Sequence, residues 1–256
     1  MKINWAKATF SLMAAMMVVL FLGVLAWPGA ASADSLDSAT GDQLVQIARG
    51  GMLYDKWYGV TKATPPNETH PSYASSKGKR KGKGTWRCKE CHGWDYMGKD
   101  GAYAKGSHFS GIVGMRGSAG GSMDSVVASL KGDAHMLGDH ISSADLNAIA
   151  AFVTKGQLDM DQYIERSSKK AKGNLKNGER IYKTTCAKCH GMDGKEINFG
   201  NEKKSVFLGT VSNGNPWETL HKIRMGQPDE DMSAMIAFPV QSQVDVLAYS
   251  QTLPTK

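Results

Sequence analysis

Two short stretches of the chain combine residue types that can attach and ligate a metal-containing group. Residues 88–92 read CKECH and residues 186–190 read CAKCH, so each stretch is a C-x-x-C-H motif. The motifs contain all four cysteines of the chain: Cys88, Cys91, Cys186 and Cys189. In c-type haem attachment, two cysteines at this spacing form thioethers with the haem vinyl groups, and the following histidine binds the iron. We therefore expect two covalently bound haem c groups, with His92 and His190 as proximal ligands.

Other chemistries of paired cysteines fit these motifs less well. A structural zinc site needs its two C-x-x-C pairs about 15–20 residues apart, and here the gap is far longer. A thioredoxin-like redox pair lies next to a parallel sheet, whereas this sequence shows almost no strand pattern. Disulfide bonds suit an exported protein, but they do not account for a histidine after each pair.

The sequence around the motifs is repeated, which indicates two copies of one structural unit. Each copy opens on a stretch of helical pattern in which a glycine precedes a tyrosine by four positions: Gly50 and Tyr54, then Gly178 and Tyr182. Each copy closes on apolar residues at helical spacing, at 145–153 and 243–250. The repeat predicts an all-α fold of two tandem units. It also predicts that Tyr54 contacts Phe152 and that Tyr182 contacts Tyr249.

Composition and the repeat together divide the chain. Residues 1–33 join a basic start, an apolar run and an A-x-A ending, which is typical of a secretory signal peptide or, if uncleaved, of an N-terminal membrane anchor. We expect a first domain at 34–153, a linker at 154–173 and a second domain at 174–256. Export makes the periplasm the expected location, with membrane association if the N-terminus is retained.

The first copy is longer than the second because it carries an insertion at about residues 61–84. Its Pro, Gly and Ser content predicts a surface loop. Residues 75–84 alternate Lys or Arg with Gly and contribute much of the net charge of +7. Export argues against nucleic acid as the partner of this basic run. It is expected to be a solvated segment or a docking patch for an acidic partner or an anionic lipid.

One family resembles the second copy over almost its whole length. The stretches NGERIYKTTCAKCHGMDG, NPWETLHKIRMGQPDEDMSAM and VDVLAYSQTLP, within residues 174–256, are similar to class I cytochrome c domains. The first copy resembles the same fold more distantly. The whole chain therefore resembles a bacterial dihaem c-type cytochrome built from two class I domains.

The resemblance also suggests the sixth ligand of each iron. In the second copy, Met232 stands where the family has its axial methionine, with Met235 and Met225 as alternatives. The corresponding position of the first copy is His135, with Met136 as its neighbour and alternative. Further first-copy candidates are His140, His108 and Met123.

The ligand sets predict two unlike haems, His/His in the first copy and His/Met in the second. A methionine ligand favours ferrous iron, so the second haem is expected to have the higher potential.

The function implied by the resemblance is one-electron transfer between redox protein partners, without a catalytic residue. No paired carboxylates, Ser/His/Asp set or phosphate-binding loop is apparent in the sequence. The alternatives are a dihaem oxidoreductase similar to thiosulfate dehydrogenases, or a cytochrome subunit of a larger dehydrogenase or reductase. The thiosulfate enzymes typically use an axial cysteine, and here the motifs occupy every cysteine.

Overall fold

The computed structural model describes residues 36, 38–74 and 76–256. The expected signal peptide or anchor at residues 1–33 lies outside the described residues. No helix in the described part is long and apolar enough to cross a membrane. The helices are α1 Gly41–Thr61, α2 Pro71–Ala74, η2 Gly82–Trp86, α3 Cys88–His92, η3 Arg116–Ser118, α4 Met123–Lys131, α5 Ser143–Ala151, η4 Phe152–Gly156, η5 Met160–Gln162, α6 Leu175–Ile181, η6 Tyr182–Cys186, α7 Ala187–His190, α8 Leu208–Gly214, α9 Pro216–Met225 and α10 Val240–Ser250.

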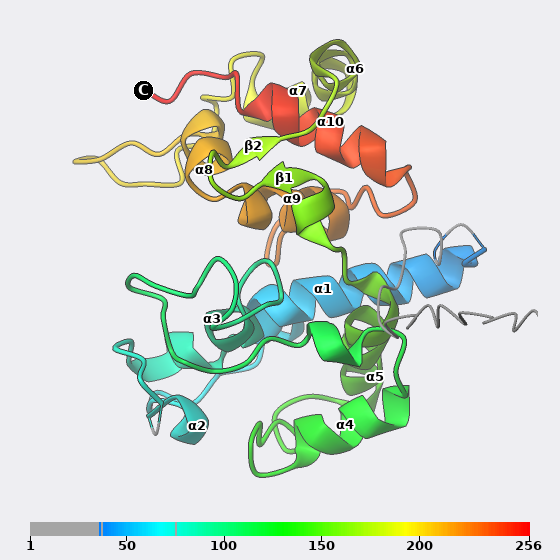
Figure 1. The fold of residues 1–256 in the computed structure, drawn as a ribbon, viewed down its shortest axis with the longest axis vertical. Helices are drawn as coiled ribbons and strands as arrows, with labels where there is room; N and C mark the ends of the chain where they lie inside the picture. Colours follow the sequence, from blue (N-terminus) through cyan, green and yellow to red (C-terminus); the bar gives the residue numbers. More distant parts are fainter. Residues whose placement is uncertain (1–35, 37, 75) are drawn as a thin grey trace, which may run out of the picture.

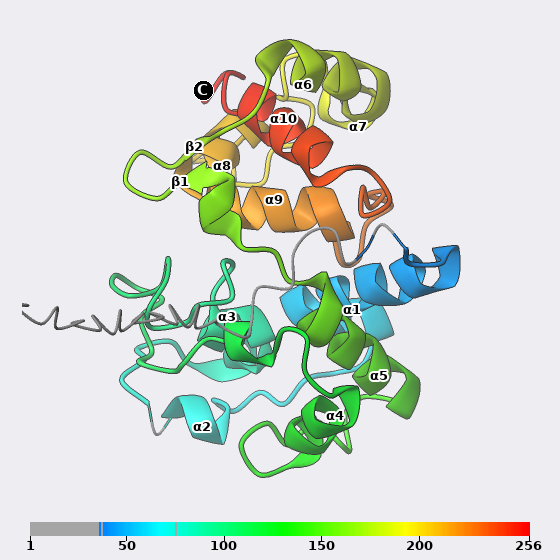
Figure 2. The same cartoon turned by 45° about the vertical axis from the view of Figure 1, so that its right-hand side comes forward.

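The helices form two groups that lie one above the other (Figure 1). The first half of the chain supplies α1 to α5, and the second half supplies α6 to α10. Helix α1 crosses the middle of the molecule, and α9 packs against it from the second half, as Figure 2 also shows. The prediction of a helical chain is confirmed. The described strands β1 (Ile164–Glu165) and β2 (Lys170–Ala171) form an antiparallel hairpin in the segment predicted as a linker.

The same helix crossing occurs in both halves. Helix α1 crosses α5 at Gly50, where a Cβ atom would clash with the backbone carbonyl of Ala148. Helix α6 crosses α10 at Gly178, where a Cβ atom would clash with the backbone carbonyl of Asp245. The absence of a side chain at each glycine lets the two backbones approach closely.

Aromatic contacts accompany each crossing. The ring centroids of Tyr54 and Phe152 are 5.3 Å apart, and those of Tyr182 and Tyr249 are also 5.3 Å apart, so both predicted contacts are confirmed. Each tyrosine hydroxyl donates a hydrogen bond to the carbonyl of the glycine that follows the motif. Tyr54 bonds to Gly93, and Tyr182 bonds to Gly191 at 2.8 Å. Each opening helix is thereby tied directly to its C-x-x-C-H motif.

We expect alanine at the crossing glycines to destabilise the fold. Gly178→Ala and Gly50→Ala should each lower the free energy of unfolding by about 1–3 kcal/mol, because the added methyl forces two backbones apart. Gly41→Ala is the matched control within α1, since a Cβ there meets nothing within 4 Å. Urea unfolding followed by circular dichroism measures all three. Equal effects at Gly41 and Gly50 would contradict the close-approach explanation.

The insertion at 61–84 is only partly the surface loop that its composition predicts. It contains α2 and the start of η2, and it buries Tyr73 and His70, which are 1% and 7% exposed. Gly78 lies against the Tyr73 ring, so the glycine that reads as a flexible position is needed for packing. The basic side chains Lys77, Lys79, Lys81 and Lys83 are exposed, as expected.

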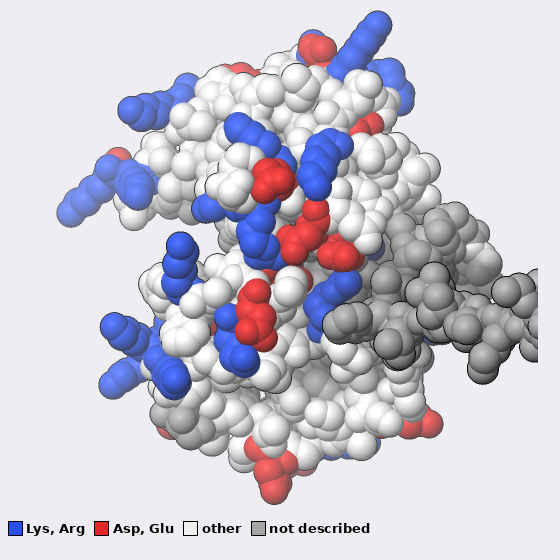
Figure 3. Space-filling view, viewed as in Figure 1, with Lys and Arg blue, Asp and Glu red and all other residues white. Residues whose placement is uncertain are grey.

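Charged side chains of both signs lie side by side where the two halves meet. Figure 3 shows them in the middle of one face of the molecule. Asp229, beyond the end of α9, pairs with Lys56 and Lys62 of the α1 region, at 2.7 Å each. Arg166 of the hairpin pairs with buried Asp95 at 2.8 Å. These ion pairs join elements from the two halves.

Candidate haem-binding sites

Both motifs form a short helical turn that ends at a glycine. Residues 88–92 are α3, and residues 187–190 are α7. A helical turn brings residues three apart to one side, so the two cysteines of each motif point in similar directions with the histidine beside them. Gly93 and Gly191 then take φ values of 75° and 79°, which turn the chain away after the histidine.

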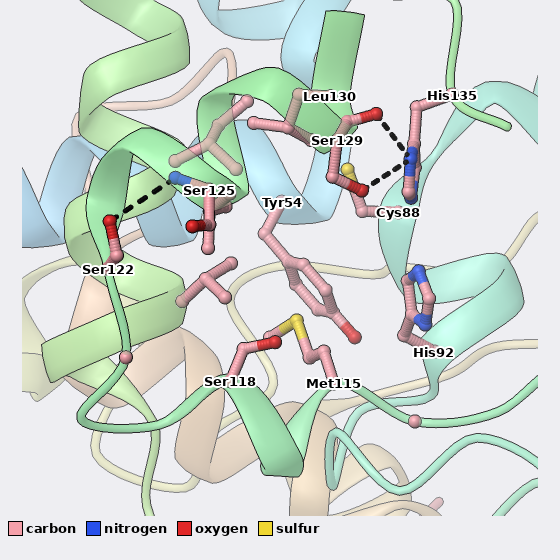
Figure 4. Close-up of a pocket in the computed structure, with 15 residues that line it drawn as sticks. Tyr54, Cys88, His92, Met115, Ser118, Ser122, Ser125, Ser129, Leu130 and His135 are labelled. Carbon is pink, nitrogen blue, oxygen red and sulfur yellow. Dashed lines mark hydrogen bonds between the residues drawn. The ribbon is translucent and has the colours of Figure 1, made fainter. Parts of the chain in front are cut away.

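A cavity of about 430 Å³ opens beside the first motif. Figure 4 shows Cys88 and His92 at one side of it and His135 facing His92. Its other walls are mostly apolar and include Tyr54, Met115, Leu130, Ile149 and Val153. The volume lies within the range typical of cofactor pockets.

Hydrogen bonds orient both imidazole rings in this cavity. The Nδ1–H group of His92 donates to the carbonyl of Val113 at 2.8 Å, and that of His135 donates to the carbonyl of Ser129 at 3.0 Å. The Nε2 atom of each ring is therefore left as a lone-pair donor for a metal. Burial lowers the pKa of His92 to about 4 and also lowers the pKa of His135, so both rings are neutral at pH 7.

The spacing of the two rings fits a single metal ion between them. Their centroids are 6.0 Å apart, and the ring planes differ by 30°. Two metal–imidazole bonds of about 2 Å each can be accommodated in that gap. With apolar walls for a porphyrin and Cys88 at the edge for a thioether, the first cavity fits a covalently attached haem.

The other first-copy candidates are engaged elsewhere. His140 packs against Trp57 and Trp86, with ring centroids 6.0 and 5.4 Å away. His108 contacts the Glu90 carboxylate at 3.1 Å. Met136 is 44% exposed, with a left-handed backbone. Met123 is partly buried against the core.

The histidine of the second motif, His190, has fewer described contacts than His92 of the first. Within the described residues, the buried Nδ1 atom of His190 has no hydrogen-bond partner, and the ring lies 6.3 Å from that of Phe199. Burial lowers the pKa of His190. Cys186 is half-buried and Cys189 is exposed.

The candidate sixth ligands of the second site lie between α9 and α10, apart from Met225. Met232 is half-buried, whereas Met235 is 5% exposed and belongs to the apolar core. Met225 ends α9 and packs against Gly51 of α1.

Comparison with known families identifies the second half. A family model described as "Cytochrome C oxidase, cbb3-type, subunit III" matches residues 173–248. These residues form a c-type cytochrome domain. Such a domain implies a covalently bound haem c and an electron-transfer role. The match covers less than a third of the chain and leaves the first motif outside it. No curated protein and no solved structure matches the chain.

The cytochrome c domain contains two buried donor groups that fit a haem. Among the described residues, the Nε1–H of Trp217 and the Nε–H of Arg224 are buried without an acceptor. The Arg224 side chain is 1% exposed, and its remaining hydrogen bonds go to uncharged groups, Gln243 and the carbonyl of Gly156. Buried donors normally have partners. The carboxylates of a haem are acceptors that the protein chain itself does not supply here.

His221 is a buried residue that the sequence did not single out. It belongs to α9 of the cytochrome c domain and is fully buried against the first half. Its Nε2–H donates to the carbonyl of Gly51 at 3.0 Å, and its Nδ1 accepts from the Tyr96 hydroxyl at 2.8 Å. Burial lowers its pKa to about 4, so the ring is neutral. Its two hydrogen bonds join α9 to Gly51 and Tyr96 of the first half. Its partners are distant in sequence, and a lone histidine in a helix gives no signal of them.

Proposed function

We propose that the chain is a periplasmic dihaem cytochrome c that carries single electrons between redox protein partners. Each half holds one haem through its C-x-x-C-H motif. The family match supports the second haem. The first is supported by the matching helix crossings, the matching tyrosine hydrogen bonds and the cavity beside Cys88.

The observation that carries the proposal is the facing pair His92 and His135 in an apolar cavity, with centroids 6.0 Å apart. These two residues would hold the first haem. His190 and Met232 would hold the second, with Met235 as the alternative to Met232. A bound haem supplies one-electron chemistry at its iron. The carbonyls of Val113 and Ser129 fix the two imidazoles, so the first site needs little rearrangement between redox states.

Filled sixth positions favour a carrier over an enzyme, because no position on the iron is left for a substrate. A second candidate follows from the description of the matched family as an oxidase subunit. The chain would then be a cytochrome subunit of a larger oxidase or reductase complex. Purification from membranes together with other subunits would favour this second candidate.

Haem content tests the proposal directly. The wild-type chain should contain two haems, and the double variants Cys88→Ala/Cys91→Ala and Cys186→Ala/Cys189→Ala should each contain one, because covalent attachment needs the cysteines. The pyridine haemochrome assay and the mass of the intact chain measure this count. The two variants serve as controls for each other. A chain that keeps its full haem content without Cys88 and Cys91 would rule out the first site.

A further inference from the structure

We propose that the insertion of the first half, residues 61–84, positions the sixth ligand of the first haem, and that His70 is the positioning residue. The inference rests on the proposed ligation of that haem by His92 and His135. It assigns a second role to a segment that the sequence predicts to be a surface loop, with a basic run that is solvated or forms a docking patch.

The insertion binds two consecutive carbonyl groups of the segment that carries His135. The Nε2–H of His70 donates to the carbonyl of His135 at 3.0 Å, and the hydroxyl of Ser72 donates to the carbonyl of Ala134 at 2.8 Å. The backbone N–H of Ser72 donates to Nδ1 of His70 at 3.2 Å. Because Nδ1 is an acceptor, the proton of the neutral ring lies on Nε2, as the bond to His135 requires.

His70 is itself held firmly. Its ring packs edge-on against Trp86 with centroids 4.3 Å apart, and its backbone N–H donates to the hydroxyl of Thr85 at 2.9 Å. The indole N–H of Trp86, just after the insertion, donates to the carbonyl of Glu68 within it at 2.9 Å. The Trp57 indole then donates to the carbonyl of Trp86 at 2.8 Å, which joins the insertion to α1. These hydrogen bonds and the ring contact hold His70 in place within the insertion.

The segment that carries His135 needs such support. Helix α4 ends before Gly132, and the chain reaches a left-handed residue at Met136 with φ 54°. His135 itself lies in a turn and is fixed from one side by its bond to Ser129 of α4. Within the turn, the backbone N–H groups of His135 and Met136 donate to the carbonyl of Gly132 at 3.0 and 2.8 Å. The insertion adds hydrogen bonds to the carbonyl groups of Ala134 and His135 from the other side.

The chemistry of the two proposed ligands, histidine and methionine, explains why only the first half has such an insertion. Methionine has three rotatable bonds and a polarizable sulfur, so its side chain can adapt to the position of a metal. Histidine has only two rotatable bonds and must aim one nitrogen of a rigid ring, so its backbone has to be placed accurately. The first half has both the insertion and His135, and the second half has neither. The two differences between the halves therefore have one explanation.

The test compares His70→Asn with His70→Gln in the full-length protein with both haems attached. The amide nitrogen of glutamine can replace Nε2 as donor to the His135 carbonyl, whereas the asparagine side chain is too short to do so. His135→Ala defines complete loss of the ligand. The readouts are the high-spin signal of the ferric protein in electron paramagnetic resonance and the number of CO molecules bound per reduced chain. The second haem is the internal reference.

We expect His70→Asn to show a high-spin first haem and to bind one CO per chain, as His135→Ala does. His70→Gln should remain mostly low-spin and bind little CO. If His70→Asn fails to fold, Ser72→Ala removes the second contact and should raise the high-spin fraction above that of the wild type. A first haem that stays low-spin in both variants, while His135→Ala becomes high-spin, overturns the role of the insertion and leaves the ligation intact. A His135→Ala protein identical to the wild type overturns the ligation and this inference together.

Discussion

Met232→His should lower the midpoint potential of the second haem and narrow the gap between the two haems. A thioether favours ferrous iron and an imidazole favours it less, so the substitution should make the second site resemble the first. The expected fall is on the order of 0.1 V, within the roughly 0.8 V range over which axial ligands set haem potentials. A redox titration followed by absorption spectroscopy measures this fall in potential. The weak far-red absorption band expected for methionine ligation of the ferric haem should disappear.

Met235→Leu is the matched control, because Met235 is the alternative ligand of the same segment. It is buried in the core, and leucine conserves its volume, so the cost in stability should stay below about 1.5 kcal/mol. The potential of the second haem and the far-red band should be unchanged. If Met235→Leu abolishes the band and Met232→His retains it, Met235 is the ligand. If the wild-type haems titrate as one indistinguishable step, the predicted difference between the haems is wrong.

Local patterns allowed a large part of the fold to be predicted. The motifs, the opening helices and the closing helices depend on spacings of a few residues, and the repeat showed which residues correspond. The contacts of Tyr54 with Phe152 and of Tyr182 with Tyr249 followed from that correspondence alone. The same register selected His135, whose ring faces His92.

Features that depend on distant contacts could not be predicted. The composition of the insertion reads as a loop, since nothing in the local sequence shows that Trp86 covers His70 or that Tyr73 packs against Gly78. His221 likewise looks like any helical histidine until Tyr96 is placed against it. The ring nitrogens of His70 and His221 bond to the carbonyl of His135 and to the Tyr96 hydroxyl, which are partners that only the tertiary fold supplies.

A buried carboxylate links the two halves and should be important for stability. Asp55 of α1 is 1% exposed and pairs with Lys222 of α9 at 2.5 Å and with Arg87, next to the first motif. Asp55→Asn keeps the shape of the side chain but removes the buried anion that Lys222 and Arg87 share, and Glu218 is a more distant partner of Lys222 at 4.0 Å. We expect the free energy of unfolding to fall by about 3 kcal/mol, as for other broken buried ion pairs.

Asp229→Asn is the control for Asp55→Asn, because Asp229 also joins the two halves through two lysines but is more exposed. Its loss should cost less than about 1 kcal/mol. Urea unfolding followed by circular dichroism compares the two variants without the screening that guanidinium ions cause. Equal decreases in the free energy of unfolding would show that burial does not strengthen the ion pairs of Asp55.

The acid sensitivity of the protein gives a second readout for Asp55. Burial alone would raise the pKa of this carboxyl, but Lys222 and Arg87 outweigh burial and lower it. A carboxyl with a lowered folded-state pKa stabilises the fold above its unfolded-state pKa of about 3.9, and this contribution is lost as the pH falls through the lowered value. The wild type should therefore lose stability below about pH 4 more steeply than Asp55→Asn. Parallel acid profiles would mean that the ion pairs of Asp55 do not contribute to folding.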